Sequence, residues 1–243
     1  MRLKPRYNAE VNQWWMCDAG RYGYKFIDKE RLLSPQKKEG IIFKEGSWDE
    51  ILEALAKRIE LFLQKNKKSA LGVCLSPQLA NEDLAVAKKF FEETLGVSTI
   101  ALLSPFPKGD EDDFLIKSDK NPNTQGALAL GVSKVSFEEM VKGIEGGKVK
   151  GLYLFGQDFV TLVGAGKGKE LLGKLEFVIF EGSNENRTTP LAHYVLPAAV
   201  YAEKNGTFTN HTGRVQRFSK ALEPLGNSLP DAEILQRLTG MLS

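Results

Sequence analysis

The sequence predicts an α/β fold, a parallel β-sheet with helices on both faces. Short runs of continuous apolar residues alternate along the chain with amphipathic segments of helical period, as in βαβ units. A hydrophobic content of 42% and a charged content of 26% fit a globular protein with a sizeable core. We expect an extended, turn-rich lead-in at residues 1–46 and an α/β domain at residues 47–243.

The first helix has a clear start. Ser47 is followed three residues later by Glu50, which is the pattern of a capping box, and apolar residues then recur with helical period until Asn66. The next expected elements alternate between strand and helix. They are a strand at 70–76, a helix at 79–95 and a strand at 97–103.

The pattern breaks at residues 104–126, where prolines and aspartates predict a loop. Ser136 and Glu139 form a second capping box, which begins a short helix. Further strands and helices follow. The strands are expected at 152–156, 177–182 and 193–198, and the helical segments at 159–175 and 229–242. Within 159–175, the stretch Gly164–Lys169 is expected to be a surface turn. It is not a phosphate loop, because Glu170 follows its last lysine instead of Ser or Thr.

Composition excludes several classes of function. The net charge is +2 with interleaved signs, which gives no case for a nucleic-acid partner. The sequence has no run of 18 apolar residues and no apolar leader, so we expect no membrane span and a cytoplasmic location. The two cysteines, Cys17 and Cys74, form no CxxC pair. A self-contained zinc or iron–sulfur site is therefore not expected.

Residues 203–217 are unusually rich in short polar side chains and glycines. Asn and Thr side chains can form hydrogen bonds to the backbone of irregular segments. Arg214 and Gln216 add hydrogen-bond donors that could bind a phosphate or an amide group of a ligand. We expect an irregular loop here. Two interpretations stay open: the loop satisfies its own polar groups, or it holds a polar ligand.

Three separated stretches carry motifs that belong together. The first is RYNAEVNQWWMCDAGR at 6–21, followed by Arg31-Leu32, Pro35 and SWDE at 47–50. The second is DKNPN at 119–123, followed by GA at 126–127. The third is TTPLAHYVLP at 188–197, followed by Glu, Gly-Thr, Asn, Gly-Arg and Gln between 203 and 216. In this order they resemble the molybdopterin-oxidoreductase superfamily. More narrowly, they resemble the C-terminal part of the large iron–sulfur subunit of the NADH–quinone oxidoreductase, respiratory complex I.

The resemblance implies a shortened molybdopterin-oxidoreductase-like domain behind a remnant of an iron–sulfur lead-in at 1–46. Cys17 matches the fourth cysteine of a 4Fe–4S cluster, whose other three would lie upstream of Met1 as C-x-x-C-x-x-x-C. Four thiolates are needed for such a cluster. Cys17 is thus expected to be either a vestigial ligand or one that completes a cluster shared with a partner polypeptide.

The third stretch implies cofactor contacts only if a pterin is retained. The matching residues are then Thr207, Asn210, Arg214 and Gln216. No residue matches the protein ligand of the metal, and the molybdenum enzymes of the family need several hundred more residues. We therefore expect no molybdopterin, no catalytic residue and no cofactor bound by this chain alone, apart from a possible shared 4Fe–4S cluster.

The resemblance implies a scaffold or accessory subunit of a complex I-like NADH:quinone oxidoreductase, in the cytoplasmic peripheral arm of that membrane-associated complex. Its partners would be iron–sulfur and flavin subunits of the respiratory chain, and no independent catalysis is expected. Trp14, Trp15, Tyr22 and Tyr24 either dock such a partner or cover the core. The alternatives are a truncated molybdopterin-dependent oxidoreductase, similar to formate dehydrogenase, or a donor of Cys17 to a 4Fe–4S cluster shared between chains.

Overall fold

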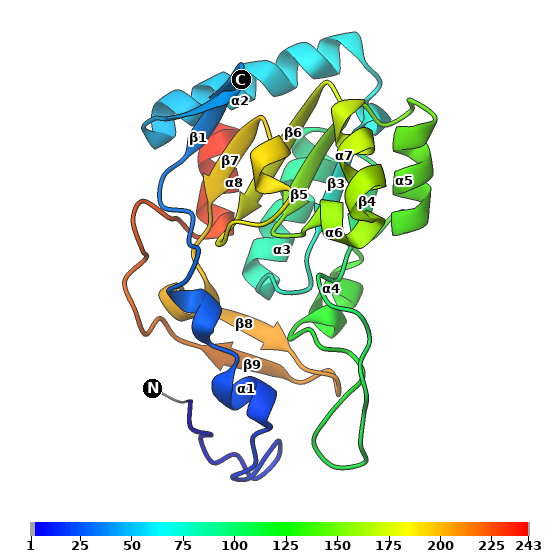
Figure 1. Cartoon of the computed structure of the whole chain (residues 1–243). Coiled ribbons are helices and arrows are strands. Elements are labelled where there is room, and N and C mark those ends of the chain that lie inside the picture. The colour runs from blue at the N-terminus through cyan, green and yellow to red at the C-terminus, as the bar shows by residue number, and fades with distance from the viewer. Residues whose placement is uncertain (1–2, 243) are drawn as a thin grey trace.

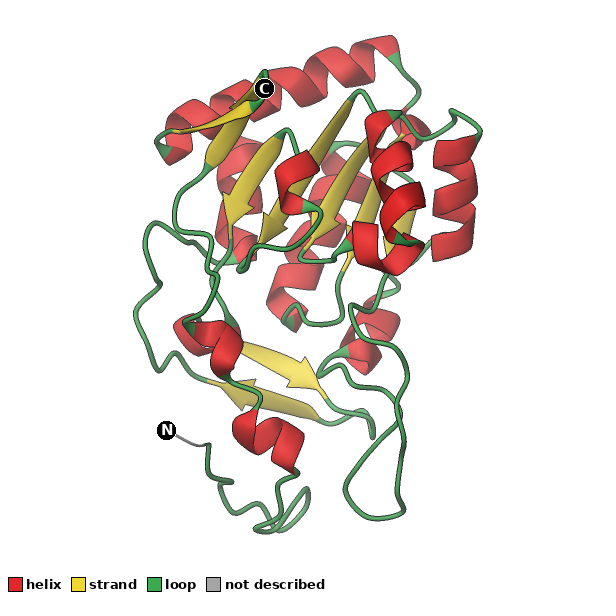
Figure 2. Ribbon diagram, viewed as in Figure 1, coloured by secondary structure: helices red, strands yellow, loops and turns green. Residues whose placement is uncertain are grey.

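A seven-stranded sheet in the order β2-β1-β7-β6-β5-β3-β4 forms the centre of the computed structural model, which describes residues 3–242 (Figures 1 and 2). The strands β7, β6, β5, β3 and β4 are parallel, whereas β1 and β2 form an antiparallel hairpin at the β7 edge. The strand bounds are β1 Gln36–Glu39, β2 Ile42–Glu45, β3 Leu71–Leu75, β4 Thr99–Leu102, β5 Gly151–Phe155, β6 Phe177–Gly182 and β7 Tyr194–Pro197.

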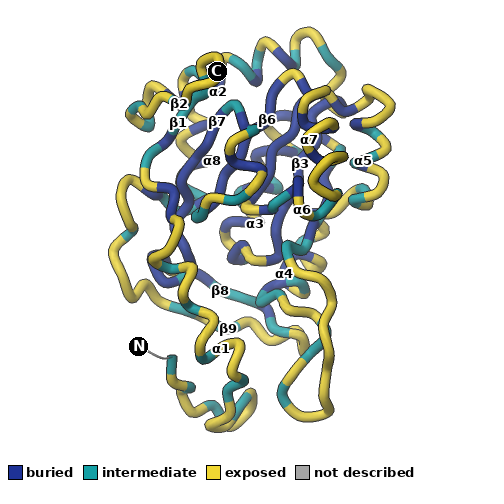
Figure 3. The backbone as a smooth tube through the Cα atoms, viewed as in Figure 1, coloured by how far each residue is buried: buried dark blue, intermediate teal, exposed yellow. Residues whose placement is uncertain are grey.

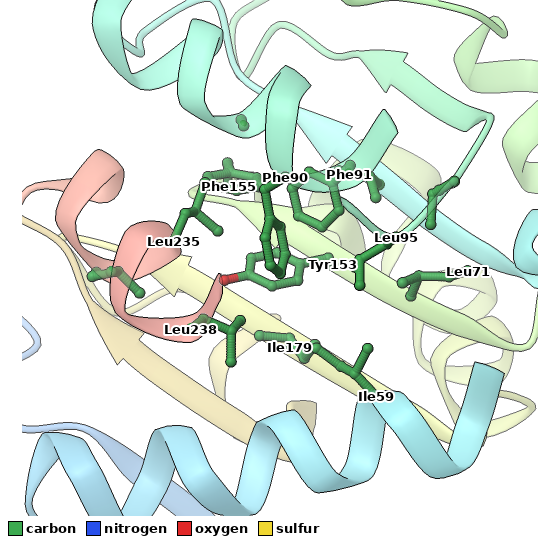
Figure 4. Packing of buried hydrophobic residues seen from close by; sticks show 14 of the residues in the cluster. Ile59, Leu71, Phe90, Phe91, Leu95, Tyr153, Phe155, Ile179, Leu235 and Leu238 are labelled. Carbon is green, nitrogen blue, oxygen red and sulfur yellow. The ribbon is translucent and has the colours of Figure 1, made fainter. Parts of the chain in front are cut away.

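Helices cover both faces of the sheet, as the sequence predicts. One face carries α2 Trp48–Lys65, α3 Asn81–Lys88 with its π-helical continuation η3 Lys89–Thr94, and α8 Asp231–Met241. The other carries α5 Phe137–Glu145, α6 Phe159–Val163 and α7 Ala165–Gly173. Successive strand residues point to opposite faces, so each strand contributes to both cores. Tyr153 packs beneath α3 and α8 beside Phe90 and Phe91, and Leu154 packs on the other face (Figure 4).

The strand order reverses between β3 and β5. From β3 the chain moves to β4 on one side, and then returns to build β5, β6 and β7 on the other. In open α/β sheets, ligands bind at the carboxyl ends of the strands near such a reversal. The carboxyl ends of the parallel strands are therefore the first place to look for a site.

A smaller layer lies beyond these carboxyl ends, in the lower part of Figure 1. Its elements are α1 Asp18–Tyr22, the 3-10 helix η1 Lys25–Ile27, α4 Thr124–Leu130, β8 Gly206–Thr209 and β9 Val215–Phe218. The connecting 3-10 turns of the chain are η2 Lys68–Ala70, η4 Thr189–Leu191 and η5 Tyr201–Glu203. Figure 3 shows that much of this layer is exposed, in contrast to the buried strands above it.

The expected helices and strands of the main sheet all occur, including both capped helix starts at Ser47 and Ser136. Two expectations are wrong. Most of the stretch 203–217 lies in the β8–β9 hairpin, which spans residues 206–218, and is not an irregular loop. Gly164–Lys169 is not a surface turn: the break falls at Gly164 alone, and α7 continues because Leu171 and Leu172 are buried against the sheet. The expected loop 104–126 ends at Asn123, where α4 begins.

The lead-in contributes to the main sheet. Gln36 and Lys37 of β1 pair with Val195 and Tyr194 of β7, so residues 36–45 extend the sheet of the α/β domain. Only the part of the lead-in before β1 belongs to the lower layer.

Candidate functional site

The four residues that match the family's pterin contacts all lie in or next to the β8–β9 hairpin. Asn210 begins its turn: the Asn210 carbonyl accepts from the Gly213 N–H at 2.9 Å, and Gly213 takes a φ of +83°. A tight turn that ends in this left-handed conformation favours glycine, and it joins antiparallel strands. The Asn210 carboxamide oxygen also accepts from the N–H groups of Thr212 and Arg214, each at 3.0 Å.

Several polar groups of these residues are bonded within the protein. Thr207 donates through its N–H and hydroxyl to Glu82, each at 2.8 Å, and Arg214 forms an ion pair with Glu10. Asn210 donates to the Gln216 side chain at 3.3 Å. An anionic pterin phosphate needs cations and free donors. In this arrangement Glu82 accepts from both donors of Thr207, and Glu10 accepts from one nitrogen of the Arg214 guanidinium.

The second stretch meets the third at Asn123, a fully buried side chain. Its amide donates to the Leu79 carbonyl at 2.8 Å, and its oxygen accepts from the Thr209 N–H at 2.7 Å. A Cβ on Gly126 would lie 2.2 Å from that oxygen, so only glycine lets α4 approach so closely. The second stretch therefore holds β8 in place from the end of the loop.

The lead-in meets the third stretch at Arg31 and Glu203. The guanidinium donates two hydrogen bonds of 2.8 Å to the two carboxylate oxygens, and both side chains are almost completely buried. Arg31 also donates to the Ile27 carbonyl at 2.6 Å and to the Ser183 carbonyl at 3.0 Å. Burial opposes ionisation of Glu203, but the bonds from Arg31 and the Val200 N–H hold its pKa below the ordinary value.

The next residue, Lys204, is the centre of a second buried charge cluster. Its ammonium donates to Asp83 at 2.7 Å and to Asp231 at 2.5 Å, at the starts of α3 and α8. Burial opposes the charge, but the two carboxylates raise the pKa of Lys204 above its ordinary value. Asp83 also accepts from the Ala80 and Ala232 N–H groups. This cluster fastens the base of the hairpin to two helices.

A buried carboxyl group with a raised pKa lies beside this cluster. Glu181, at the carboxyl end of β6, accepts from the Tyr153 hydroxyl. Burial and then the charge of Asp231 raise the pKa of Glu181 well above its ordinary value, and its Oε1 receives no donor. All three side chains are buried, so the group contacts no open site.

Sequence reasoning missed these buried charges. Lys204, Asp83, Glu181 and Asp231 carry no motif, and charged residues are normally exposed. The only local signal is the position of Asp83 and Asp231 at helix starts, which is shared by many exposed carboxylates.

Cys17 lies in the lower layer, partly exposed, where its Sγ accepts from the Gly20 N–H at 3.4 Å and caps α1. Within residues 3–242 no three Cys, His, Asp or Glu side chains are grouped so as to hold a metal ion. Cys74 lies in the core, as expected from its apolar surroundings, and burial raises its pKa to about 12.

The rings of the lead-in do not cover the core. Trp14 is 66% exposed, Trp15 55% and Tyr22 53%. Trp15 packs edge-on against Phe114 of the 104–123 loop at 5.1 Å, and Trp14 packs against Tyr7 at 5.0 Å. We call Tyr7, Trp14, Trp15, Tyr22 and Phe114 the aromatic surface. Tyr24 is partly buried and lies outside it.

None of the helices in the described part of the chain is long and apolar enough to cross a membrane. The family model described as molybdopterin oxidoreductase matches residues 118–241. The chain is 42% identical over 106 residues to the NADPH-Fe(3+) oxidoreductase subunit alpha of Geobacter sulfurreducens, covering 43% of this chain and 13% of that protein. It is equally similar over 106 residues to a candidate formate dehydrogenase of Staphylococcus aureus, covering 43% of this chain and 11% of that one.

These relatives are much longer than this chain, which matches little more than a tenth of their length. Among solved structures, acetylene hydratase from Pelobacter acetylenicus superposes with a TM-score of 0.60 at 12% identity. The superposition covers 93% of this chain and 63% of the hydratase. At this identity the likeness concerns the fold alone.

Proposed function

Because the chain belongs to the molybdopterin oxidoreductase family, we propose that it supplies the family's α/β domain to a larger oxidoreductase, as a scaffold or accessory subunit. One observation carries this proposal. The three motif stretches bond one another through Arg31 and Glu203, Glu10 and Arg214, and Asn123 and Thr209, while the aromatic surface beside them stays exposed. Polar groups that bond one another stabilise the domain and fit a scaffold role. Exposed aromatic rings fit a surface that binds a partner protein.

The assembly we propose is a complex I-like NADH:quinone oxidoreductase. The lead-in motif at 6–21 supports it, because this motif resembles the large iron–sulfur subunit of that complex. Iron–sulfur and flavin subunits would carry the electrons, and this chain would lie in the cytoplasmic peripheral arm without binding a cofactor alone. It would perform no reaction by itself.

The test is isolation of the native protein at low and high salt. We expect it to elute with iron–sulfur and flavin polypeptides, and the double variant Trp14→Ser, Trp15→Ser to elute alone. A matched control is Ile41→Ser, since Ile41 is 92% exposed but belongs to the β1–β2 turn. Recovery of the unmodified protein as a free monomer in every salt condition would contradict the proposal.

A second candidate is a part of a formate dehydrogenase-like enzyme that retains its pterin. The 42% identity over 106 residues to such a relative favours it. Thr207 and Arg214 would then release their bonds to Glu82 and Glu10 and donate to the pterin instead. Molybdenum or tungsten in stoichiometric amount, with pterin fluorescence in the isolated assembly, would decide for this candidate and against a cofactor-free scaffold.

A third candidate concerns Cys17. Its thiol is partly exposed and its only hydrogen bond in the described chain is to the Gly20 N–H, so a companion polypeptide could reach it. In that case Cys17 would be the fourth ligand of a shared 4Fe–4S cluster. The cluster's EPR signal in the assembly should then disappear in Cys17→Ala, and an unchanged spectrum would remove this candidate.

A further inference from the structure

A groove runs between α7 and the segment from Arg187 to His193, on the face of the sheet that carries α5, α6 and α7. It consists of two adjoining hollows of about 360 and 330 Å³, which share Lys169 and Leu191. We call it the basic groove. Neither hollow is lined by a residue of the β8–β9 hairpin. Figure 1 places α7 and β7 in the upper part of the molecule, away from that hairpin.

The titratable lining of the basic groove is basic throughout. Lys38, Lys169 and His193 line the first hollow, Lys169 and Arg187 the second, and no carboxylate lines either. The neighbouring lysines of α7 differ from Lys169: Lys167 pairs with Glu145, and Lys174 pairs with Glu170. The side chains of Lys169 and Arg187 have no hydrogen bond or ion pair among residues 3–242. Their charges are therefore available to a ligand.

Two donors at the first hollow are held in place. The Val178 N–H donates to Nδ1 of His193 at 3.0 Å, so the neutral ring carries its proton on Nε2 and can donate from there. The Lys38 ammonium donates to the Pro190 carbonyl at 2.7 Å and keeps further protons for another acceptor. Fixed donors beside free cations favour an oxyanion.

The floor of the first hollow is apolar. Leu172 and Leu175 line it and are almost completely buried, and Leu191 lines both hollows. A volume of about 360 Å³ lies in the range of sites for small organic molecules. A ligand that used both parts of the site would combine an acidic group with an apolar body.

We propose that the basic groove binds a small organic anion. Its phosphate or carboxylate group lies among Lys38, Lys169 and His193, and its apolar body lies on Leu172, Leu175 and Leu191. This site is independent of the scaffold role, because it shares no residue with the hairpin or the aromatic surface.

The test is an NMR titration of the whole protein with hexyl phosphate, inorganic phosphate and hexanol, each up to about 20 mM. We expect saturable shifts at His193 and Lys169 with hexyl phosphate, at least about tenfold tighter than with inorganic phosphate, and none with hexanol. Lys169→Met should weaken binding about five- to tenfold. The matched control is Lys167→Met, which removes the same charge from the same helix and should change binding less than about twofold.

Several results would overturn the proposal. One is the absence of saturation with hexyl phosphate, and another is equal weakening by Lys167→Met and Lys169→Met. A third is tighter binding of poly-glutamate than of hexyl phosphate, with the same dependence on Lys169. That result would assign the groove to an acidic segment of a partner protein. Because Lys169 and Lys167 are exposed, both variants should fold, which circular dichroism checks.

Discussion

Arg31 and Glu203 are joined by two parallel hydrogen bonds of 2.8 Å, although 172 residues separate them in the chain. Their side chains are only 1% and 2% exposed. The bond fixes the lead-in to the segment that precedes the β8–β9 hairpin. Removing one partner of a buried ion pair leaves the other charge without compensation, which is more costly than the loss of an exposed pair.

Glu203→Gln should therefore lower the free energy of unfolding by about 3–5 kcal/mol at pH 7. The matched control is Glu223→Gln, because Glu223 pairs with Lys220 but is 87% exposed; it should change stability by at most about 1 kcal/mol. Urea denaturation measures both. The pKa of Glu203 is lowered in the fold, so its contribution is present above the ordinary pKa of 4.5 and is lost as the pH falls further. Glu203→Gln should accordingly show a smaller loss of stability in acid than the unmodified protein.

Lys204→Met should also destabilise the fold at pH 7, by about 3–5 kcal/mol, because Asp83 and Asp231 then lose their shared cation. Buried carboxylates without a cation have raised pKa values and become neutral in mild acid. The difference in stability between this variant and the unmodified protein should thus shrink as the pH falls from 7 toward 4. Urea midpoints at several pH values test this, and a difference that grows in acid would contradict it.

Glu181→Gln should not destabilise the fold at pH 7, because burial raises the pKa of Glu181 well above its ordinary value and so favours the uncharged form that Gln resembles. A raised pKa means that the folded state keeps a proton that the unfolded state loses. The contribution is complete below the ordinary pKa of 4.5 and is lost as the pH rises through the higher value in the fold. The variant should therefore lose less stability than the unmodified protein as the pH rises above 4.5, which thermal unfolding scans at several pH values measure. A cost of about 3 kcal/mol at pH 7 would instead indicate an ionised Glu181.

Asn210→Ala should cost about 1–2 kcal/mol, since it removes the oxygen that accepts from the Thr212 and Arg214 N–H groups. Arg214→Ala should cost less, at most about 1 kcal/mol, because Arg214 and Glu10 are 43% and 67% exposed. Chemical denaturation of both variants checks the order. A larger effect of Arg214→Ala would mean that its guanidinium has a structural role that the pair with Glu10 does not explain.

An element could be predicted from the sequence when the residues that stabilise it lie close together in the chain. The starts of α2 and α5 were predictable because Ser47 with Glu50 and Ser136 with Glu139 act within four residues. The hairpin was not, because β8 takes its bonds from Glu82 and Asn123, far away in the sequence. The same polar residues that suggested an irregular loop are those that join this hairpin to its neighbours.

The candidate site shows the same limit. Motif spacing led to the family, and it selected Thr207, Asn210, Arg214 and Gln216. It did not indicate that Lys204 and Glu181 are buried with shifted pKa values, because that environment forms only when α3, α8 and β6 pack together. Nor did it indicate the basic groove, which combines the β1 edge with one side of α7.

The distance between Arg31 and Glu203 also has a consequence for synthesis on the ribosome. At about 5–20 residues per second, Glu203 is added on the order of ten to thirty seconds after Arg31. During that interval the lead-in has neither its buried partner nor β7, and its tryptophans are exposed in an unanchored segment. Translation at least as far as Glu203 must therefore precede the closure of the fold around Arg31.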